Sequence, residues 1–151
     1  MFIIPILLAL LVSYEMAISG AIAFAFTGVF TFLFKQVLFK GIPRPTAFFT
    51  NGELTHFMDG FDYHSYNSFP SGHTMTSFAM LLFIALLVNK KWFGAVALLL
   101  SVLSGVSRMY LLQHFFMDVY VGSALGVLSL LIGYHLGVNR LGKKYPVLKR
   151  R

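Results

Sequence analysis

The chain has 151 residues, of which 58% are hydrophobic and only 11% are charged, and its mean hydropathy is +0.78. A water-soluble domain of this length needs more polar surface than so few charges supply, so lipid surrounds most of the protein. Cysteine is absent, which excludes disulfides and thiolate zinc sites. The net charge of +7 does not indicate a nucleic-acid partner, because most basic residues flank apolar segments and no known nucleic-acid-binding module is present.

The apolar residues fall in five long blocks. A spanning helix needs about 20 apolar residues; the second and fifth blocks reach this length, and the third and fourth approach it. The first block is shorter, and we interpret it as a short or truncated spanning helix. The pattern predicts an all-α, polytopic transmembrane helix bundle with about five membrane helices, folded as a single domain over residues 1–151. The blocks are residues 1–12, 16–39, 70–88, 92–106 and 115–138.

Basic residues indicate how the predicted helices are oriented. Lys90 and Lys91 lie in the turn between the third and fourth blocks, and more Lys and Arg residues lie in the tail, residues 139–151. Both places fall on one side of the membrane if blocks three to five all span it, and their positive charge predicts that this side is cytoplasmic. Residues 40–69 and 107–114 then meet at the opposite face, which is the arrangement that an active site needs.

Three residues at that face have the chemistry of phosphoryl transfer. His114 and Asp118 are four residues apart and would share a face of a helix. Asp118 could accept the Nδ1–H of His114 and leave Nε2 free to attack phosphorus. His73 could then protonate the departing alcohol. Because ionisable groups beside membrane helices are costly, they are functional candidates.

Five further residues could bind the phosphate. Ser71 and Gly72 precede a long apolar helix, whose free N–H groups bind anions, and glycine lets an oxyanion approach the backbone closely. Arg44 and Arg108 could grip phosphate oxygens through paired hydrogen bonds. Lys35, near the end of the second block, adds a positive charge that would stabilise the transition state.

These residues form three motifs in chain order. In the third and most specific motif, Ser107-Arg108 is followed after five residues by His114 and after three more by Asp118. Pro-Ser-Gly-His occupies residues 70–73, and Arg44-Pro45 ends the first motif. Together they resemble the signature of the type 2 phosphatidic acid phosphatase superfamily, the lipid phosphate phosphatases.

The lysine of the first motif has two candidates. In the family that the chain resembles, six residues usually separate this lysine from Arg-Pro, and the corresponding position is Val37 in this chain. Lys35 leaves eight intervening residues and Lys40 leaves three. We favour Lys35, with residues 41–43 absorbing the two extra residues, and keep Lys40 as the alternative.

The resemblance covers about residues 16–138 and leaves a basic cytoplasmic tail at 139–151. It implies a helical bundle of usually six spans, a phosphohistidine intermediate, and no metal or other cofactor. It also implies an integral protein of a bacterial inner membrane, whose site faces the periplasm or the outside. The expected partners are the bilayer and a lipid phosphate: phosphatidic acid, phosphatidylglycerol phosphate, undecaprenyl diphosphate or a lipid A phosphate. The sequence does not choose among these substrates, nor does it indicate an oligomeric state.

Two other functions stay open at this point. The same residues would serve a lipid phosphotransferase until the acceptor step, and a non-catalytic transport or assembly protein would not need His114. The loop contains residue types that suit a divalent ion, but their spacing matches no known site, so we expect a solvated loop. These residues are His56, Asp59, Asp62 and His64.

Two groups of residues have roles other than catalysis. Aromatic residues of the loop either dip into the headgroup layer or pack the loop: Phe48, Phe49, Phe57, Phe61 and Phe69. Small residues of the fourth and fifth blocks suit close packing between helices: Gly94, Gly105, Gly122, Ser123, Gly126 and Gly133.

Overall fold

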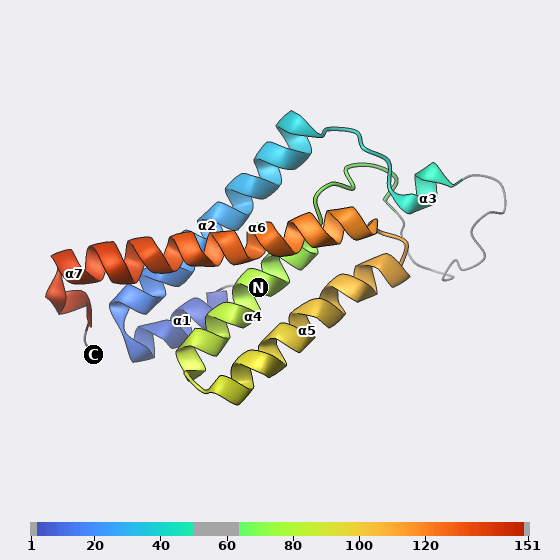
Figure 1. The fold of residues 1–151 in the computed structure, drawn as a ribbon. Helices are drawn as coiled ribbons and strands as arrows, with labels where there is room; N and C mark the ends of the chain where they lie inside the picture. Colours follow the sequence, from blue (N-terminus) through green and yellow to red (C-terminus); the bar gives the residue numbers. More distant parts are fainter. Residues whose placement is uncertain (1–2, 50–63, 150–151) are drawn as a thin grey trace.

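The computed structural model describes residues 3–49 and 64–149 (Figure 1). Over these ranges the chain is helical and forms no strand, apart from one isolated antiparallel bridge between Pro43 and Tyr66. Two of the helices continue into π-helical turns at their carboxyl ends. The elements are α1 (Ile3–Val12), α2 (Tyr14–Phe32) with η1 (Leu33–Leu38), α3 (Pro45–Phe48), α4 (Gly72–Val88), α5 (Lys91–Tyr110), α6 (Phe116–Tyr134) with η2 (His135–Leu141), α7 (Gly142–Lys144) and η3 (Pro146–Lys149).

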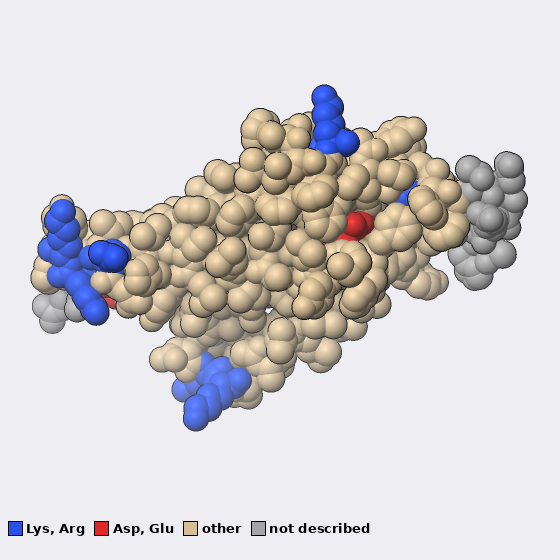
Figure 2. All heavy atoms as spheres, turned by 45° about the horizontal axis from the view of Figure 1, so that its top comes forward, with Lys and Arg blue, Asp and Glu red and all other residues tan. Residues whose placement is uncertain are grey.

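The fold is a helical membrane bundle, as the sequence predicts. Three helical stretches are long and apolar enough to cross a membrane: Tyr14–Leu38, Lys91–Tyr110 and Phe116–Lys144. Ile3–Val12 and Gly72–Val88 are shorter apolar helices, so the five predicted blocks are five helices. Large apolar side chains cover their outer faces, and Figure 2 shows a broad uncharged surface between groups of Lys and Arg. Such a surface is stable in lipid and not in water.

Local hydrogen bonds and turn geometry set the helix ends. Ser13 caps α2 by accepting a bond from the N–H of Met16 at 3.2 Å. Asn89 ends α4 in the left-handed conformation, with φ at 51°. Helix α5 runs four residues beyond its predicted end at 106. Backbone hydrogen bonding continues through these polar residues, and the N–H of Leu111 still donates to the carbonyl of Ser107 at 3.0 Å.

Helix α6 is the centre of the bundle, and it packs along both α2 and α4. Glycines allow this approach. A Cβ atom on Gly122 would lie 2.6 Å from the carbonyl oxygen of Ser71, the residue before α4, and one on Gly126 would lie 2.4 Å from that of Met75 in α4. One on Gly133 would lie 2.5 Å from a carbonyl oxygen of α2. The predicted packing role therefore fits these glycines but not Gly94, whose Cβ would have no described atom within 4 Å.

The two ends of the bundle differ in character. Segment 40–49, segment 64–70 and the α5–α6 connection come together at one end, whereas the α4–α5 turn and α7 lie towards the other (Figure 1). Aromatic packing consolidates the first end. Phe69 contacts Phe34 and Phe39 with ring centroids 6.3 Å and 4.8 Å away, and Phe48 contacts Phe115 at 5.7 Å. Phe57 and Phe61 lie outside the described residues.

A larger side chain at position 126 should destabilise the bundle. We expect Gly126→Val to lower the free energy of unfolding by about 1–3 kcal/mol, the usual cost of overpacking a well-packed interface. Gly94→Val is the matched control, since open space surrounds its Cβ position. Thermal unfolding of both variants in detergent measures the difference, and equal midpoints would contradict the packing of α6 against α4.

Candidate active site

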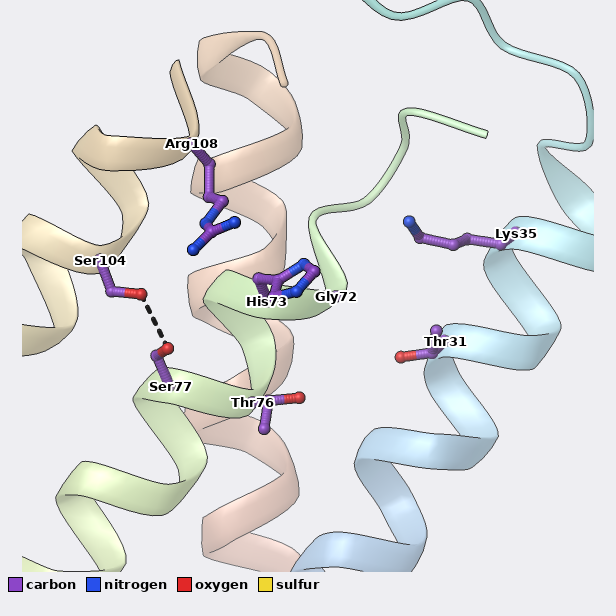
Figure 3. Close-up of a pocket in the computed structure, with 8 residues that line it drawn as sticks. All are labelled: Thr31, Lys35, Gly72, His73, Thr76, Ser77, Ser104 and Arg108. Atoms are coloured by element: carbon purple, nitrogen blue, oxygen red, sulfur yellow. Dashed lines mark hydrogen bonds between the residues drawn. The ribbon is translucent and has the colours of Figure 1, made fainter. Parts of the chain in front are cut away.

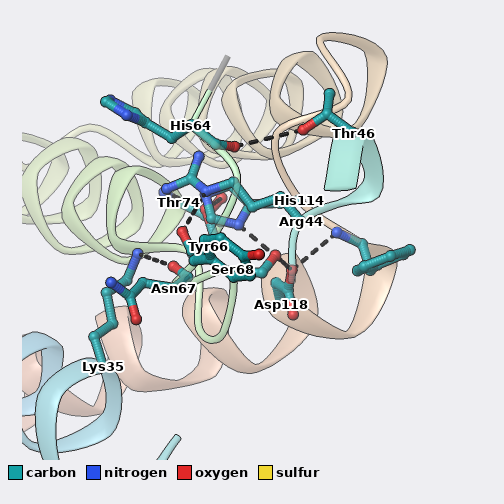
Figure 4. A network of polar contacts seen from close by, with 12 residues as sticks. Lys35, Arg44, Thr46, His64, Tyr66, Asn67, Ser68, Thr74, His114 and Asp118 are labelled. Atoms are coloured by element: carbon teal, nitrogen blue, oxygen red, sulfur yellow. Dashed lines mark hydrogen bonds and ion pairs between the residues drawn. The ribbon is translucent and has the colours of Figure 1, made fainter. Parts of the chain in front are cut away.

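Three segments of the chain meet at the carboxylate of Asp118. This residue lies in the first turn of α6 and is 4% exposed. Its Oδ2 atom accepts hydrogen bonds from the Ser68 hydroxyl and, at 2.9 Å, from the backbone N–H of Phe115. Its backbone carbonyl accepts a bond from the N–H of Ser71 at 2.9 Å. Asp118 therefore joins the start of α6 to the start of α4 and to segment 64–70 (Figure 4).

His114 lies in the connection between α5 and α6, just before Phe115, the N-cap residue of α6. His114 and Asp118 therefore meet at the start of a helix, and they do not share a helical face as we expected. The Nδ1 atom of His114 is 3.4 Å from Oδ2 of Asp118, which is longer than a strong hydrogen bond. Nδ1 has no hydrogen-bond partner among the described residues. A small approach of the two side chains would complete the predicted bond.

The surroundings of His114 favour its neutral form. The side chain is buried, and this burial is the main reason why the pKa of His114 lies below its usual value of 6.5. Asp118 opposes the shift, whereas the positive charges of Arg44 and Lys35 lower the pKa further. A neutral imidazole keeps a free lone pair on one ring nitrogen, which is what a nucleophile needs.

Backbone carbonyls of consecutive residues hold two cations at the site. The Nε atom of Arg44 donates to the carbonyl of Tyr66 at 3.0 Å, and its backbone N–H donates to the carbonyl of Ser65 at 2.9 Å. The Nζ atom of Lys35 donates to the carbonyl of Asn67 at 3.1 Å. These acceptors are neutral, so both positive charges remain available to an anionic ligand.

A cavity of about 420 Å³ opens between α2, α4 and α5 (Figure 3). Lys35 and Arg108 extend from opposite sides towards His73 and Gly72 at the N-terminus of α4. The structure thus brings four predicted residues to one cavity, with two cations beside free helical N–H groups. The lining residues are Thr31, Lys35, Gly72, His73, Thr76, Ser77, Ser104 and Arg108.

Ser71 lies at the start of α4, as the sequence predicts, but its side chain does not reach the cavity. It is fully buried and does not line the cavity. Its hydroxyl oxygen accepts bonds from the N–H and the hydroxyl of Thr74, at 3.4 Å and 2.9 Å. Ser71 is therefore the N-cap of α4, and its side chain orders the helix start where Gly72 and His73 lie.

The structure distinguishes the two candidate lysines. Lys35 lines the cavity, whereas Lys40 is exposed and does not. Lys35 belongs to the π-helical turn η1, which holds more residues per turn than an α-helix, and Gly41 turns the chain with φ at +82°. These two features accommodate the longer spacing between Lys35 and Arg44.

Sequence reasoning missed three residues at the site. Ser68 and Asn67 hold Asp118 and Lys35, as described above. Gln113 accepts a bond from Nη1 of Arg108 at 3.1 Å and donates its backbone N–H to the Arg108 carbonyl at 3.0 Å. Their one signal in the sequence is their place: Asn67 and Ser68 are polar residues shortly before the Pro-Ser-Gly-His motif, and Gln113 directly precedes His114 within the third motif.

The loop residues that resemble metal ligands are only partly described. His64 is described, and its carbonyl accepts a bond from the Thr46 hydroxyl at 3.5 Å. The other three lie outside the described residues: His56, Asp59 and Asp62.

The helices and the polar cluster define a class: a helical membrane protein with cations and histidines gathered at one end of the bundle. Comparison with known families agrees with this class. The family model of the PAP2 superfamily matches residues 16–141. The chain therefore belongs to the PAP2 superfamily.

Curated relatives carry the names of lipid phosphatases. The chain is 35% identical over 127 residues to probable lipid phosphate phosphatase 4 of Arabidopsis thaliana, an alignment that covers 67% of this chain and 41% of the relative. It is 34% identical over 88 residues to phosphatidylglycerophosphatase B of Bacillus subtilis, covering 51% of this chain and 43% of the relative. It is 34% identical over 70 residues to lipid A 1-phosphatase of Porphyromonas gingivalis, covering 45% and 16%. The chain thus spans less than half the length of these relatives. No solved structure matches it.

The environment of His114 predicts how this residue titrates. Because its pKa is lowered, His114 should stay mostly neutral as the pH falls through 6.5 and gain its proton only below that value. The midpoint can be measured by NMR on protein with labelled histidine in detergent, with the signal assigned by its loss in His114→Asn. A midpoint at or above 6.5 would contradict the buried, cation-flanked environment.

Proposed function

We propose that this protein hydrolyses the phosphate of a membrane lipid phosphate or diphosphate through a phosphohistidine formed on His114. One observation carries the proposal: the buried His114 lies beside the Asp118 carboxylate and near the positive charges of Lys35 and Arg44, and Lys35 also lines the cavity together with Arg108. Phosphoryl transfer asks a protein mainly for a positioned nucleophile and for positive charge around the phosphoryl oxygens. Membership of the PAP2 superfamily supports this chemistry.

The reaction would proceed in two displacements. Nε2 of His114 attacks phosphorus, the bond to the lipid oxygen breaks, and His73 donates a proton to that oxygen. Asp118 stabilises the positive charge that His114 acquires. Water then attacks the phosphorus and gives a proton to His73, the phosphorus–nitrogen bond breaks, and inorganic phosphate leaves with His114 regenerated.

The position of the cavity supports a lipid as the substrate. A second cavity of about 370 Å³ shares Thr31, Lys35 and Thr76 with the first and extends along α2. Phe24 and Phe32 belong to its lining and are 49% and 65% exposed on the lipid-facing side of the bundle. The phosphate would bind near Lys35, and the apolar chains of the substrate would extend from the site into the second cavity along α2.

We further propose a topology in which the site faces the periplasm or the outside and the C-terminal tail is cytoplasmic. The α4–α5 turn and α7 lie towards the end of the bundle away from the site (Figure 1), and the exposed basic residues in and next to them support this orientation under the positive-inside rule. They belong to Lys90, Lys91, Arg140, Lys143 and Lys144.

Replacing the nucleophile should abolish phosphate release. We expect His114→Asn to lose at least about 10³-fold in kcat, as removal of a covalent catalyst does. Phosphate release should be measured on a panel of phosphatidic acid, phosphatidylglycerol phosphate, undecaprenyl diphosphate and lipid A phosphate. Rapid quenching should trap acid-labile phosphate on the wild type and not on the variant.

The same panel separates the alternatives. Phosphate that appears on an added lipid acceptor instead of in solution would indicate a phosphotransferase. Wild-type protein inactive on every lipid would favour a non-catalytic membrane protein, and full activity of His114→Asn would exclude the proposed mechanism.

The two lysines provide a matched pair. Lys35→Met should lower kcat/KM by about 10- to 100-fold, because one hydrogen bond to a charged phosphate is lost. Lys40→Met removes the same charge from an exposed position outside the cavity and should change kcat/KM by less than about twofold. A loss of kcat/KM in Lys40→Met, with little change in Lys35→Met, would instead identify Lys40 as the lysine that binds the phosphate.

A further inference from the structure

Segment 65–68 contacts three of the proposed site residues through four consecutive positions. The carbonyls of Ser65 and Tyr66 bind Arg44, the carbonyl of Asn67 binds Lys35, and the hydroxyl of Ser68 binds Asp118. The first three contacts use backbone atoms, which any residue could supply. Only the contact of Ser68 depends on the identity of the side chain.

The geometry of Ser68 is that of a dedicated donor. The residue has no exposed surface. Its backbone N–H donates to the carbonyl of Ile42 at 3.1 Å, which fixes the main chain. Its hydroxyl donates to Oδ2 of Asp118, the oxygen that faces Nδ1 of His114. Ser71, equally buried, uses its hydroxyl to cap α4, whereas Ser68 lies outside any helix and caps none.

We propose that Ser68 is a positioning residue for the nucleophile: its hydroxyl holds the Asp118 carboxylate in the orientation that presents Oδ2 to Nδ1 of His114. The inference rests on the proposed function, because it assigns Ser68 a part in activating the same histidine. Ser68 does not touch the substrate in this scheme and acts only through Asp118.

The physical reason is the burial of the carboxylate. Oδ2 has two donors, the Ser68 hydroxyl and the Phe115 N–H, and lies 3.4 Å from the imidazole. A buried carboxylate that loses a donor is poorly solvated and turns towards whatever donor remains. The remaining N–H belongs to the helix start and cannot alone fix the rotation of the carboxylate about its side-chain bonds. Without Ser68, the imidazole would lose its oriented acceptor, and both its tautomer and its ring position would become less defined.

The test compares Ser68→Ala with Ser123→Ala. Ser123 is a residue of α6, and its hydroxyl donates a hydrogen bond to the carbonyl of Tyr120 in the same helix, at 2.7 Å. We expect Ser68→Ala to lower kcat by about 10- to 100-fold, the effect of losing one hydrogen bond to a charged group, with KM changed by less than about twofold. Ser123→Ala should change neither.

A readout that needs no turnover accompanies the kinetics. The ring-nitrogen NMR shifts of His114 report its tautomer, and they should move in Ser68→Ala and stay at the wild-type values in Ser123→Ala. If wild-type protein hydrolyses none of the four lipids, the proposed function fails, while the shifts of His114 still decide the role of Ser68. If Ser68→Ala does not fold, Ser68→Cys keeps the size of the side chain with a much weaker donor and should show the same loss of kcat and the same change of shifts.

Wild-type kcat in a folded Ser68 variant, or unchanged His114 shifts, would overturn the proposal. A rise in KM with unchanged kcat would also overturn it, because that result assigns Ser68 to substrate binding.

Discussion

A buried carboxylate in the polar end of a membrane bundle must have hydrogen-bond donors, and this requirement organises the site around Asp118. No single helix can supply them all. The donors to its side chain come from Ser68, in the segment before α4, and from Phe115, at the start of α6. Its backbone carbonyl takes a third from Ser71 at the start of α4. Satisfying one anion therefore brings together segments that lie up to 50 residues apart in the chain.

The same anion stands among more positive groups than it can neutralise. Lys35 and Arg44 donate to neutral carbonyls, and Arg108 donates to the side-chain amide of Gln113. These hydrogen bonds therefore hold the cationic side chains in place, and none of the acceptors is an acidic group. Such an arrangement is preorganised for an anionic group, because little side-chain reorganisation is needed when that group arrives. Lys35 and Arg44 also add to the effect of burial, which is the main cause of the lowered pKa of His114. In the proposed mechanism, groups that bind the phosphate therefore help to keep the nucleophile neutral.

Much of this organisation could be read from the sequence, because it is local. Apolar blocks set the five helices, and fixed spacing places His114 near Asp118 and brings Ser71, Gly72 and His73 to one helix start. The unpredicted parts depend on long-range contacts or on helix geometry. Ser68 meets its partner only in the folded chain, and the π-helical turn that places Lys35 has no obvious sequence signal. His114 lies outside α6 because the Asp118 carboxylate accepts the N–H of Phe115. This bond makes Phe115 the N-cap residue, so the helix begins at Phe116.

The glycines of α6 have a mechanical consequence for this site. At Gly122 and Gly126 the backbone of α6 rests directly on carbonyl oxygens of α4, so the two helices that carry His73 and Asp118 are separated by main-chain atoms and not by side chains that could change rotamer. Helices in such contact resist rolling and moving apart. Helix α5 has three buried residues, against five in α4 and six in α6, and is freer to tilt. A change in bilayer thickness would therefore be absorbed on the Arg108 side of the cavity, while the distance between the helices that carry His73 and Asp118 stays constant.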